Sequence, residues 1–179
     1  SPLTSYPGGA FLKSVMDKTI ALLAILLLGP LMLGVAAIIK LSSPGPVLFR
    51  QNRHGWNGNI IEVLKFRSMR IHDVKTVVQA TKNDPRVTPV GKFLRRSSID
   101  ELPQLFNVLR GDMSLVGPRP HAVAHNDYYS DKILAYMARH RIKPGITGLA
   151  QVSGYRGETE TIDKMQKRVE LDLDYINHW

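Results

Sequence analysis

Two adjacent carboxylates, Asp100 and Glu101, are the side chains of this sequence that best combine reactivity with a suitable setting. They lie in SSIDELPQLFNVLRGDMSLVGPRP, residues 97–120, at the predicted start of a helix. The N-terminus of a helix stabilises anions and attracts phosphate groups. An ionised aspartate that can hold a divalent cation is also a competent nucleophile toward phosphorus. The setting of this pair therefore suggests phosphoryl chemistry.

The same pair also fits a purely structural role. Ser98 and Glu101 match the capping box, in which the Glu101 side chain would bond back to the Ser98 backbone N–H. Pro103 favours a helix that begins at Asp100 instead, because a missing N–H costs nothing at the third helical position. The local pattern by itself favours the cap and leaves the nucleophile open.

Basic side chains add support for phosphoryl chemistry. Such chemistry needs positive groups around the transferred oxygens. A single surface lysine or arginine is usually just solvated, but three groups at element ends and in loops around the dyad are harder to explain in that way. These groups are Lys65 with Arg67, Arg95 with Arg96, and Arg119 in the stiff GPRP loop.

Composition and charge limit the classes of partner. The 179-residue chain has a net charge of +9 and no cysteine. The six basic and six acidic residues after position 140 cancel, so the surplus lies in residues 1–140 and indicates an anionic partner. The lack of cysteine excludes disulfides, thiolate zinc sites and a cysteine nucleophile. There is no recognisable nucleic-acid-binding motif, so no nucleic-acid partner is expected.

One pair of histidines has a spacing that metal ligands also use. His121 and His125 lie four residues apart, which could place both on one face of a helix. Their stretch, HAVAH, lacks the glutamate of the HExxH zinc motif. Metal ligation by this pair is therefore not expected.

An uncharged run of 20 residues, IALLAILLLGPLMLGVAAII (20–39), predicts association with a membrane. A helix of that length spans about 30 Å, roughly the hydrocarbon thickness of a bilayer. Gly29 and Pro30 lie at its centre, where the proline is expected to kink the helix. Two arrangements stay open: a kinked helix that spans the bilayer, and a re-entrant helical hairpin that enters and leaves by the same face. Basic residues on both flanks suit the hairpin.

The rest of the chain predicts a small mixed domain of the α+β class. Residues 47–66 read as a hairpin of two strands around a Gly/Asn turn. Helices are predicted from Pro89, from about Ser98 to Gly111, over 131–141 and from Thr159, with a short strand within 141–157. The last helix carries an apolar stripe that is expected to be core: Ile162, Met165, Val169, Leu173 and Ile176. We expect a membrane-associated segment, residues 1–41, and a catalytic domain, residues 42–179.

Several ordered blocks of the chain resemble one known family. They are the broken apolar helix followed by SSPGPVLFRQNRHG (42–55), then KFRSM (65–69), IDELPQLFNVLRGDMSLVGPRP (99–120) and RIKPGITGLAQVSG (141–154). These blocks are similar to those of the bacterial sugar transferases, the monotopic phosphoglycosyl transferases that charge a polyprenyl phosphate with a sugar phosphate. The resemblance covers about residues 13–179. The block 154–179 is similar to the subgroup that transfers glucose 1-phosphate for exopolysaccharide synthesis.

The resemblance implies a role for each candidate residue. Asp100 matches the family nucleophile and would also contact Mg²⁺, the implied cofactor, and Glu101 matches its partner. Lys65, Arg95 and Arg119 fall where the family binds phosphate, with Arg67 and Arg96 as weaker candidates. The apolar segment matches a re-entrant helical hairpin broken at Gly29-Pro30, and the domain would carry amphipathic interfacial helices.

The resemblance also implies a reaction and a place. A hexose 1-phosphate, glucose 1-phosphate first, would pass from a UDP-sugar to undecaprenyl phosphate through an aspartyl phospho-sugar, with release of UMP. Transfer of galactose or N-acetylhexosamine 1-phosphate stays open, as does a non-catalytic, membrane-anchored module that binds anionic lipid. The expected place is the cytoplasmic face of the bacterial inner membrane, in contact with membrane lipids. The oligomeric state stays open, a homo-oligomer included. Since the chain begins with Ser, we expect it to be the catalytic part of a longer protein.

Overall fold

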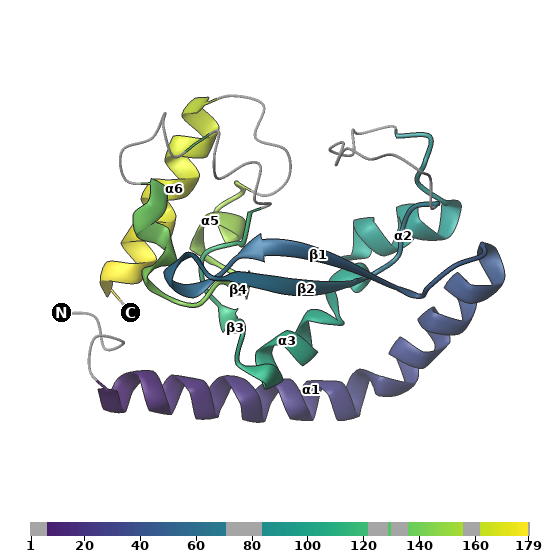
Figure 1. Cartoon of the computed structure of the whole chain (residues 1–179), viewed down its shortest axis with the longest axis horizontal. Helices are drawn as coiled ribbons and strands as arrows, with labels where there is room; N and C mark the ends of the chain where they lie inside the picture. Colours follow the sequence, from purple (N-terminus) through teal and green to yellow (C-terminus); the bar gives the residue numbers. More distant parts are fainter. Residues whose placement is uncertain (1–6, 71–83, 122–128, 130–135, 156–161, 179) are drawn as a thin grey trace.

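The computed structural model describes residues 7–70, 84–121, 129, 136–155 and 162–178 (Figure 1). The described part is a mixed α+β structure, as predicted, with one long N-terminal helix beneath a small domain. Its elements are α1 (Pro7–Ser42), β1 (Leu48–His54), η2 (Trp56–Gly58), β2 (Ile60–Phe66), α2 (Pro89–Ser97), η3 (Ile99–Glu101), α3 (Gln104–Arg110), β3 (Ser114–Val116), η4 (Tyr136–Arg141), β4 (Gly145–Thr147), α5 (Leu149–Val152) and α6 (Ile162–His178).

The predicted hairpin is confirmed. Strands β1 and β2 pair antiparallel over seven residues each, from Leu48 opposite Phe66 to His54 opposite Ile60. The connection contains Asn57 and Gly58, both with positive φ (53° and 75°). Asparagine and glycine tolerate this left-handed region best, which is why the Asn/Gly pattern marks the turn.

Helix α1 is continuous from Pro7 to Ser42, with Pro30 inside it. Its axis turns in its second half, so that its last turns rise along the side of the domain (Figure 1). The predicted break at Gly29-Pro30 is therefore a bend in one helix, and the two arms do not fold back on each other. A bend is the expected effect of a proline that removes one helical hydrogen bond.

Both halves of α1 pack on the same domain. Ala21 of the first half joins a cluster with Val108 and Met113, and Ile39 of the second half joins one with Phe66. A polar contact fixes the first turns: the Ser114 hydroxyl donates to Asp17 at 2.6 Å and accepts from the Lys13 Nζ at 2.6 Å. The helix is thus bound to the domain along most of its length.

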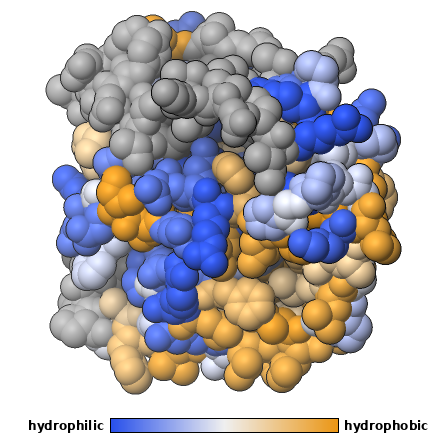
Figure 2. All heavy atoms as spheres, turned by 45° about the vertical axis from the view of Figure 1, so that its right-hand side comes forward, coloured by the Kyte–Doolittle hydropathy of each residue, from blue (hydrophilic) through white to orange (hydrophobic). Residues whose placement is uncertain are grey.

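The opposite face of α1 is apolar and exposed. Only 17% of its most apolar 18-residue window is buried inside the protein, and it is the one helix of the described part that is long and apolar enough to cross a membrane. In Figure 2 the hydrophobic side chains gather along the lower part of the molecule, where α1 lies in Figure 1. Exposed apolar surface of this extent marks a contact with another apolar phase.

Helix α3 is tied to the hairpin by one buried polar side chain. The Asn107 side chain is fully buried, accepts from the Leu64 backbone N–H at 3.0 Å and donates to the Glu62 carbonyl at 2.7 Å. It therefore pairs with two backbone groups on the edge of β2, of which the Glu62 carbonyl also accepts from the Arg110 guanidinium at 3.2 Å. These two hydrogen bonds fix the distance between β2, which carries Lys65 near its end, and α3, which follows the dyad.

The predicted start of α2 is confirmed, whereas the helix predicted over 98–111 and the apolar stripe of α6 are confirmed in part. Pro89 is the first residue of α2, and its cap is the Thr88 hydroxyl, which accepts from the Gly91 N–H at 2.9 Å. The helix predicted over 98–111 is divided into the 3₁₀ turn η3 and the helix α3, which ends at Arg110 and is capped by Gly111 (φ 88°). Within the predicted apolar stripe of α6, Met165, Val169 and Ile176 are buried and Leu173 packs beside them, whereas Ile162 is exposed at the first turn. The start predicted at Thr159 lies outside the described residues.

Two short strands that were predicted only in part bring distant segments together. Strand β4 confirms the strand expected within 141–157, but it pairs in parallel with β3, which was predicted as loop. The close approach depends on glycine, because a Cβ added to Gly145 would lie 2.1 Å from the Gly117 backbone nitrogen. This contact seats the GPRP loop, and with it Arg119, against residues 144–148.

We expect Gly145→Ala to destabilise the protein by about 1–3 kcal/mol, the usual cost of overpacking a closed contact. The strands must separate to admit the methyl group, since the atoms that it meets belong to the backbone. Thermal unfolding in detergent should then shift down by several degrees. Gly34→Ala is the matched control, because nothing lies within 4 Å of its added Cβ. Equal melting temperatures for the two variants would contradict the tight β3–β4 contact.

Candidate active site

The dyad lies in the turn between two helices. Ser98 ends α2 in the left-handed conformation (φ 62°), and the chain then forms η3, which carries Asp100 and Glu101. Both carboxylates are buried, with 9% and 8% of their surfaces exposed. Ser98 makes no side-chain capping bond. The capping-box alternative is therefore wrong for this turn.

The Glu101 carboxylate is the anion that holds two of the predicted cations. It accepts from the Lys65 Nζ at 2.9 Å and from the Arg119 guanidinium at 2.5 Å. Burial alone would raise the pKa of Glu101, but the hydrogen bonds and charges of Arg119 and Lys65 outweigh it and lower that pKa to about 2. The carboxylate is therefore ionised at neutral pH and links the end of β2 to the GPRP loop.

Asp100 has a different environment from its neighbour. Within the described ranges no lysine or arginine forms an ion pair with Asp100, in contrast to Glu101. Burial raises the pKa of Asp100, and the charges of Lys65, Arg95 and Arg119 act in the opposite direction. The charge of the neighbouring Glu101 raises the pKa of Asp100 as well, and together with burial it outweighs the three cations. The Asp100 carboxylate thus feels nearby positive charges but has no ion-pair partner among the described residues, which leaves it free to act as a nucleophile.

The remaining predicted cations, Arg95, Arg96 and Arg67, lie at three different locations. Arg95 acts on Asp100 by its charge, and so belongs to the same cluster as Lys65 and Arg119. Arg96 is exposed on α2, and its charge is not among the main causes of the pKa shifts of Asp100 and Glu101. Arg67 is buried and donates to the carbonyls of Pro44 and, at 2.7 Å, Ser43. Arg67 therefore holds the turn that follows α1, and the structure does not bring it to the dyad.

Sequence reasoning missed a further cation in this cluster, Arg53. Its guanidinium donates to the Pro120 carbonyl at 2.7 Å and to the Gln51 side chain at 2.6 Å. Burial, followed by the charge of Arg119, lowers the pKa of Arg53 to about 10. The only signal in the sequence was the position of Arg53 in the FRQNRHG block. The alternation of side chains along the predicted strand does not indicate a contact with Pro120, 67 residues away.

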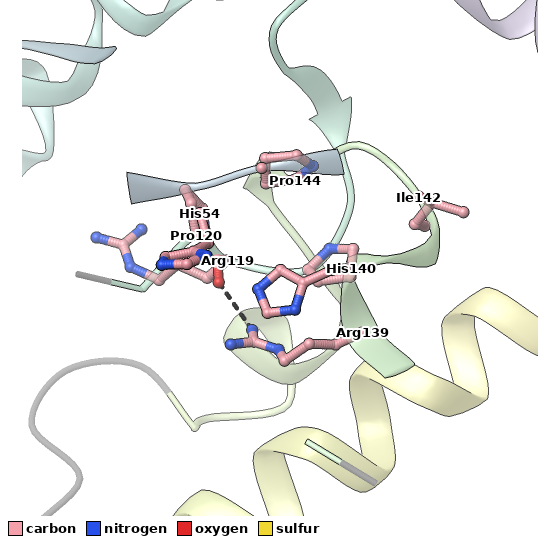
Figure 3. A pocket seen from close by; sticks show the side chains of 9 residues that line it. His54, Arg119, Pro120, Arg139, His140, Ile142 and Pro144 are labelled. Atoms are coloured by element: carbon pink, nitrogen blue, oxygen red, sulfur yellow. Dashed lines mark hydrogen bonds between the residues drawn. The ribbon is translucent and has the colours of Figure 1, made fainter. Parts of the chain in front are cut away.

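A buried pair behind the GPRP loop was also missed. Arg139 is 2% exposed, and its guanidinium bonds Asp172 of α6 at 2.6 and 3.1 Å. The same guanidinium donates to the Arg119 carbonyl at 2.7 Å. In Figure 3 the Arg119 carbonyl oxygen faces Arg139, while the Arg119 guanidinium points away from the His140 ring. The backbone of the loop is thus fixed from behind, and its side chain is left to reach Glu101.

The structure agrees with the exclusion of a histidine metal site as far as it is described. The His121 ring is buried against the guanidiniums of Arg139 (2.6 Å) and Arg168 (3.4 Å), and burial followed by these charges lowers its pKa well below the usual value. A metal cation would be repelled there. His125 lies outside the described residues.

Two cavities adjoin the cluster. The one drawn in Figure 3, lined by His54, Arg119 and His140 among others, has about 10 Å³ of free space, which is room for about one water molecule. The second, of about 240 Å³, lies between η3 and β4 and has Glu101 in its wall. Of the two, only the second is large enough to receive part of a substrate.

The donor set at the dyad suits Mg²⁺ that is shared with a substrate. Magnesium in proteins is typically held by one or two carboxylates together with substrate phosphates. Asp100 supplies one unengaged carboxylate, and no group of three or more His, Asp or Glu residues that could hold a metal occurs in the described part of the chain. The residues therefore fit a metal bound jointly with a diphosphate, and they do not fit a site built from protein ligands alone.

The family model for bacterial sugar transferases matches residues 8–179. The chain belongs to the bacterial sugar transferase family. This confirms the resemblance derived from the sequence blocks. The candidate site described above lies within the matched residues, in the blocks around KFRSM, IDELPQ, GPRP and KPGITG.

Several curated relatives of this sugar transferase carry names that state an activity. A protein of Escherichia coli (strain K12), 60% identical over 94% of this chain and 36% of its own length, is a UDP-glucose:undecaprenyl-phosphate glucose-1-phosphate transferase. A Caulobacter vibrioides protein of the same name is 54% identical over 99% of this chain and 69% of its own length. A UDP-N-acetylgalactosamine-undecaprenyl-phosphate N-acetylgalactosaminephosphotransferase of Aeromonas hydrophila is 47% identical over 97% of this chain and 41% of its own length. The chain thus spans little more than a third of the Escherichia coli relative.

Proposed function

We propose that this sugar transferase moves glucose 1-phosphate from UDP-glucose to undecaprenyl phosphate and releases UMP. The observation that carries the proposal is the contrast within the dyad: Asp100 is buried and forms no ion pair among the described residues, while Glu101 is held by Lys65 and Arg119. The names of the two relatives at 60% and 54% identity support glucose. The Aeromonas relative supports N-acetylgalactosamine as the second candidate sugar.

The proposed reaction consists of two displacements at one phosphorus atom. An Asp100 carboxylate oxygen attacks the sugar-bearing phosphorus of the UDP-sugar, and the bond to the oxygen of UMP breaks as that group leaves with the electron pair. An oxygen of the polyprenyl phosphate then attacks the same phosphorus. The bond to Asp100 breaks, the carboxylate is restored, and the product is a polyprenyl diphosphate sugar.

The cations stabilise the charge that this chemistry generates. The charges of Lys65, Arg95 and Arg119 act on Asp100, and positively charged donors fixed around a phosphoryl group lower the barrier to its transfer. Because Glu101 holds Lys65 and Arg119 in place before substrate binds, little reorganisation is needed during the reaction. Mg²⁺, held by Asp100 and the substrate phosphates, would neutralise the diphosphate and assist the departure of UMP.

We propose that α1 is a re-entrant helix that keeps the site at the cytoplasmic face of the inner membrane. A helix that spanned the bilayer upright would carry one of its halves away from the domain, but both halves of α1 pack on it. Exposed Phe93 and Phe106, on helices that also contact α1, would add to the interfacial surface. A site at headgroup level lets a soluble nucleotide sugar and a lipid phosphate reach one carboxylate.

Cysteine labelling in sealed vesicles tests this topology. The chain has no cysteine, so single substitutions Ser5→Cys and Ser42→Cys report on the two ends of α1 without background. A re-entrant helix predicts that a membrane-impermeant maleimide labels both positions from the same side. Labelling of the two positions from opposite sides would establish a spanning helix and overturn the proposed topology.

A screen of UDP-sugars for UMP release, with polyprenyl phosphate and Mg²⁺ present, tests the proposed function. We expect turnover with UDP-glucose that depends on the lipid acceptor, and slower or no turnover with UDP-N-acetylgalactosamine and UDP-galactose. Free sugar phosphate formed without the lipid would indicate a phosphohydrolase instead. No turnover with any UDP-sugar would favour a module that binds anionic lipid without chemistry.

A further inference from the structure

The cavity of about 240 Å³ beside Glu101 is not assigned by the chemistry described so far. Its walls come from two segments: residues 98–105, which contribute Ser98, Glu101, Leu102 and Leu105, and residues 146–151, which contribute Ile146, Thr147 and Gln151. The lining combines the aliphatic side chains of Leu102, Leu105 and Ile146 with the polar residues Ser98, Glu101, Thr147 and Gln151. This is the usual composition of a site for a small organic ligand.

The size of the cavity limits what can enter it. Pockets that enclose a whole drug-sized ligand measure about 300–1,000 Å³. This cavity is smaller and opens to solvent, so its walls suit one ring of a substrate while the rest of a nucleotide sugar would lie outside them. The residue in its wall that adjoins the proposed nucleophile is Glu101. In a UDP-sugar the ring nearest to the attacked phosphorus is the hexose, whereas the uracil is separated from it by the ribose and the second phosphate.

One side chain that lines this cavity has a polar atom without a hydrogen-bond partner among the described residues. The Gln151 Oε1 is buried and has no hydrogen-bond partner among the described residues. A buried amide oxygen without a partner costs free energy, so a ligand that supplies one gains affinity. The terminal torsion of glutamine is broad, and turning the amide toward the cavity therefore costs little.

We infer that this cavity is the hexose subsite and that the Gln151 amide hydrogen-bonds a hydroxyl of the transferred sugar. A hydroxyl both donates and accepts, so it suits the oxygen and the nitrogen of the amide alike. The apolar faces of Leu102, Leu105 and Ile146 would contact the carbon–hydrogen face of the ring. This inference rests on the proposed function, since it assumes that a UDP-sugar is the donor substrate.

The variant Gln151→Leu tests the assignment, because leucine has a similar size but no hydrogen-bonding group. We expect kcat/KM for UDP-glucose to fall about tenfold, the value of one hydrogen bond to a neutral partner. Inhibition by UMP, which contains the uridine but no hexose, should not change. The KM for polyprenyl phosphate should not change either. Val152→Leu, at an exposed neighbouring position, is the matched control.

A second measurement uses the unaltered protein and does not depend on how well the variant folds. UDP-glucose analogues that each lack one hydroxyl are compared, and one of them should lose about the same tenfold factor. Gln151→Leu should not discriminate against that analogue, because the partner of the hydroxyl is already gone.

Three results would overturn the hexose subsite. An equal loss of UMP inhibition in Gln151→Leu would place the uridine in the cavity, and a raised KM for polyprenyl phosphate would place the lipid there. Unchanged kinetics with UDP-glucose would remove Gln151 from the site. Failure of the proposed function is distinguishable from all three, because the unaltered protein would then show no turnover.

Discussion

Asp100→Asn should abolish the release of UMP from UDP-glucose, with a loss of about 1,000-fold or more. The amide keeps the shape of the side chain but is a poor nucleophile, and removal of a nucleophile is among the largest single effects known in enzymes. The fold should persist, because no ion pair of Asp100 is lost within the described part of the chain. Turnover with UDP-glucose and polyprenyl phosphate, measured as UMP formed, is the readout.

Asp112→Asn is the matched control for this substitution. Asp100 precedes α3 and Asp112 follows it. Asp112 is paired with Arg110 on the surface, and surface pairs contribute little to stability. We expect its activity to equal that of the unaltered protein. Membrane binding should be the same in all three proteins, since α1 is unchanged. Activity of Asp100→Asn within tenfold of normal would show that another group attacks the phosphorus.

Glu101→Gln should lower kcat about 100-fold. The amide keeps the size of the side chain and loses the charge that holds Lys65 at 2.9 Å and Arg119 at 2.5 Å. Two partly buried cations then lose their shared, buried anion, and breaking such a pair by removing one partner is unfavourable. Both side chains would move apart, and the proposed phosphate-binding geometry around Asp100 would be lost. We also expect a lower melting temperature.

The chain supplies a matched control in Glu62, whose carboxylate pairs with Arg50 on the exposed side of the hairpin. Glu62→Gln should leave both kcat and the melting temperature nearly unchanged. If Glu101→Gln lowered the melting temperature but kept kcat, Glu101 would be a structural anchor only. Such a result would contradict its role in ordering the cations for reaction.

The sequence predicted those turns and helix starts whose backbone conformation is determined by residues close together in the chain. The Gly/Asn turn defined the hairpin, and Pro89 defined the start of α2, because each residue restricts its own backbone. The dyad was found because Asp100, Glu101 and Pro103 are close in sequence. Their assignment as nucleophile and partner stays a prediction, as does the division of the chain at residues 41 and 42.

Contacts between distant segments could not be predicted in this way. Strands β3 and β4 have three residues each, too few to show an alternating pattern. Arg67 follows Lys65 by two residues, yet β2 ends at Phe66, so Arg67 turns to the Ser43 carbonyl while Lys65 reaches Glu101. The buried Arg139–Asp172 pair joins residues 33 apart, each of which looks like an ordinary surface charge in the sequence.

Mass spectrometry of the protein during turnover tests the central claim most directly. The protein is mixed with UDP-glucose and Mg²⁺ without lipid acceptor, quenched in acid and digested. The account predicts a mass increment of one phosphorylated hexose on the peptide that contains Asp100, which disappears after polyprenyl phosphate is added. Turnover without any increment, or an increment on a residue other than Asp100, would contradict it.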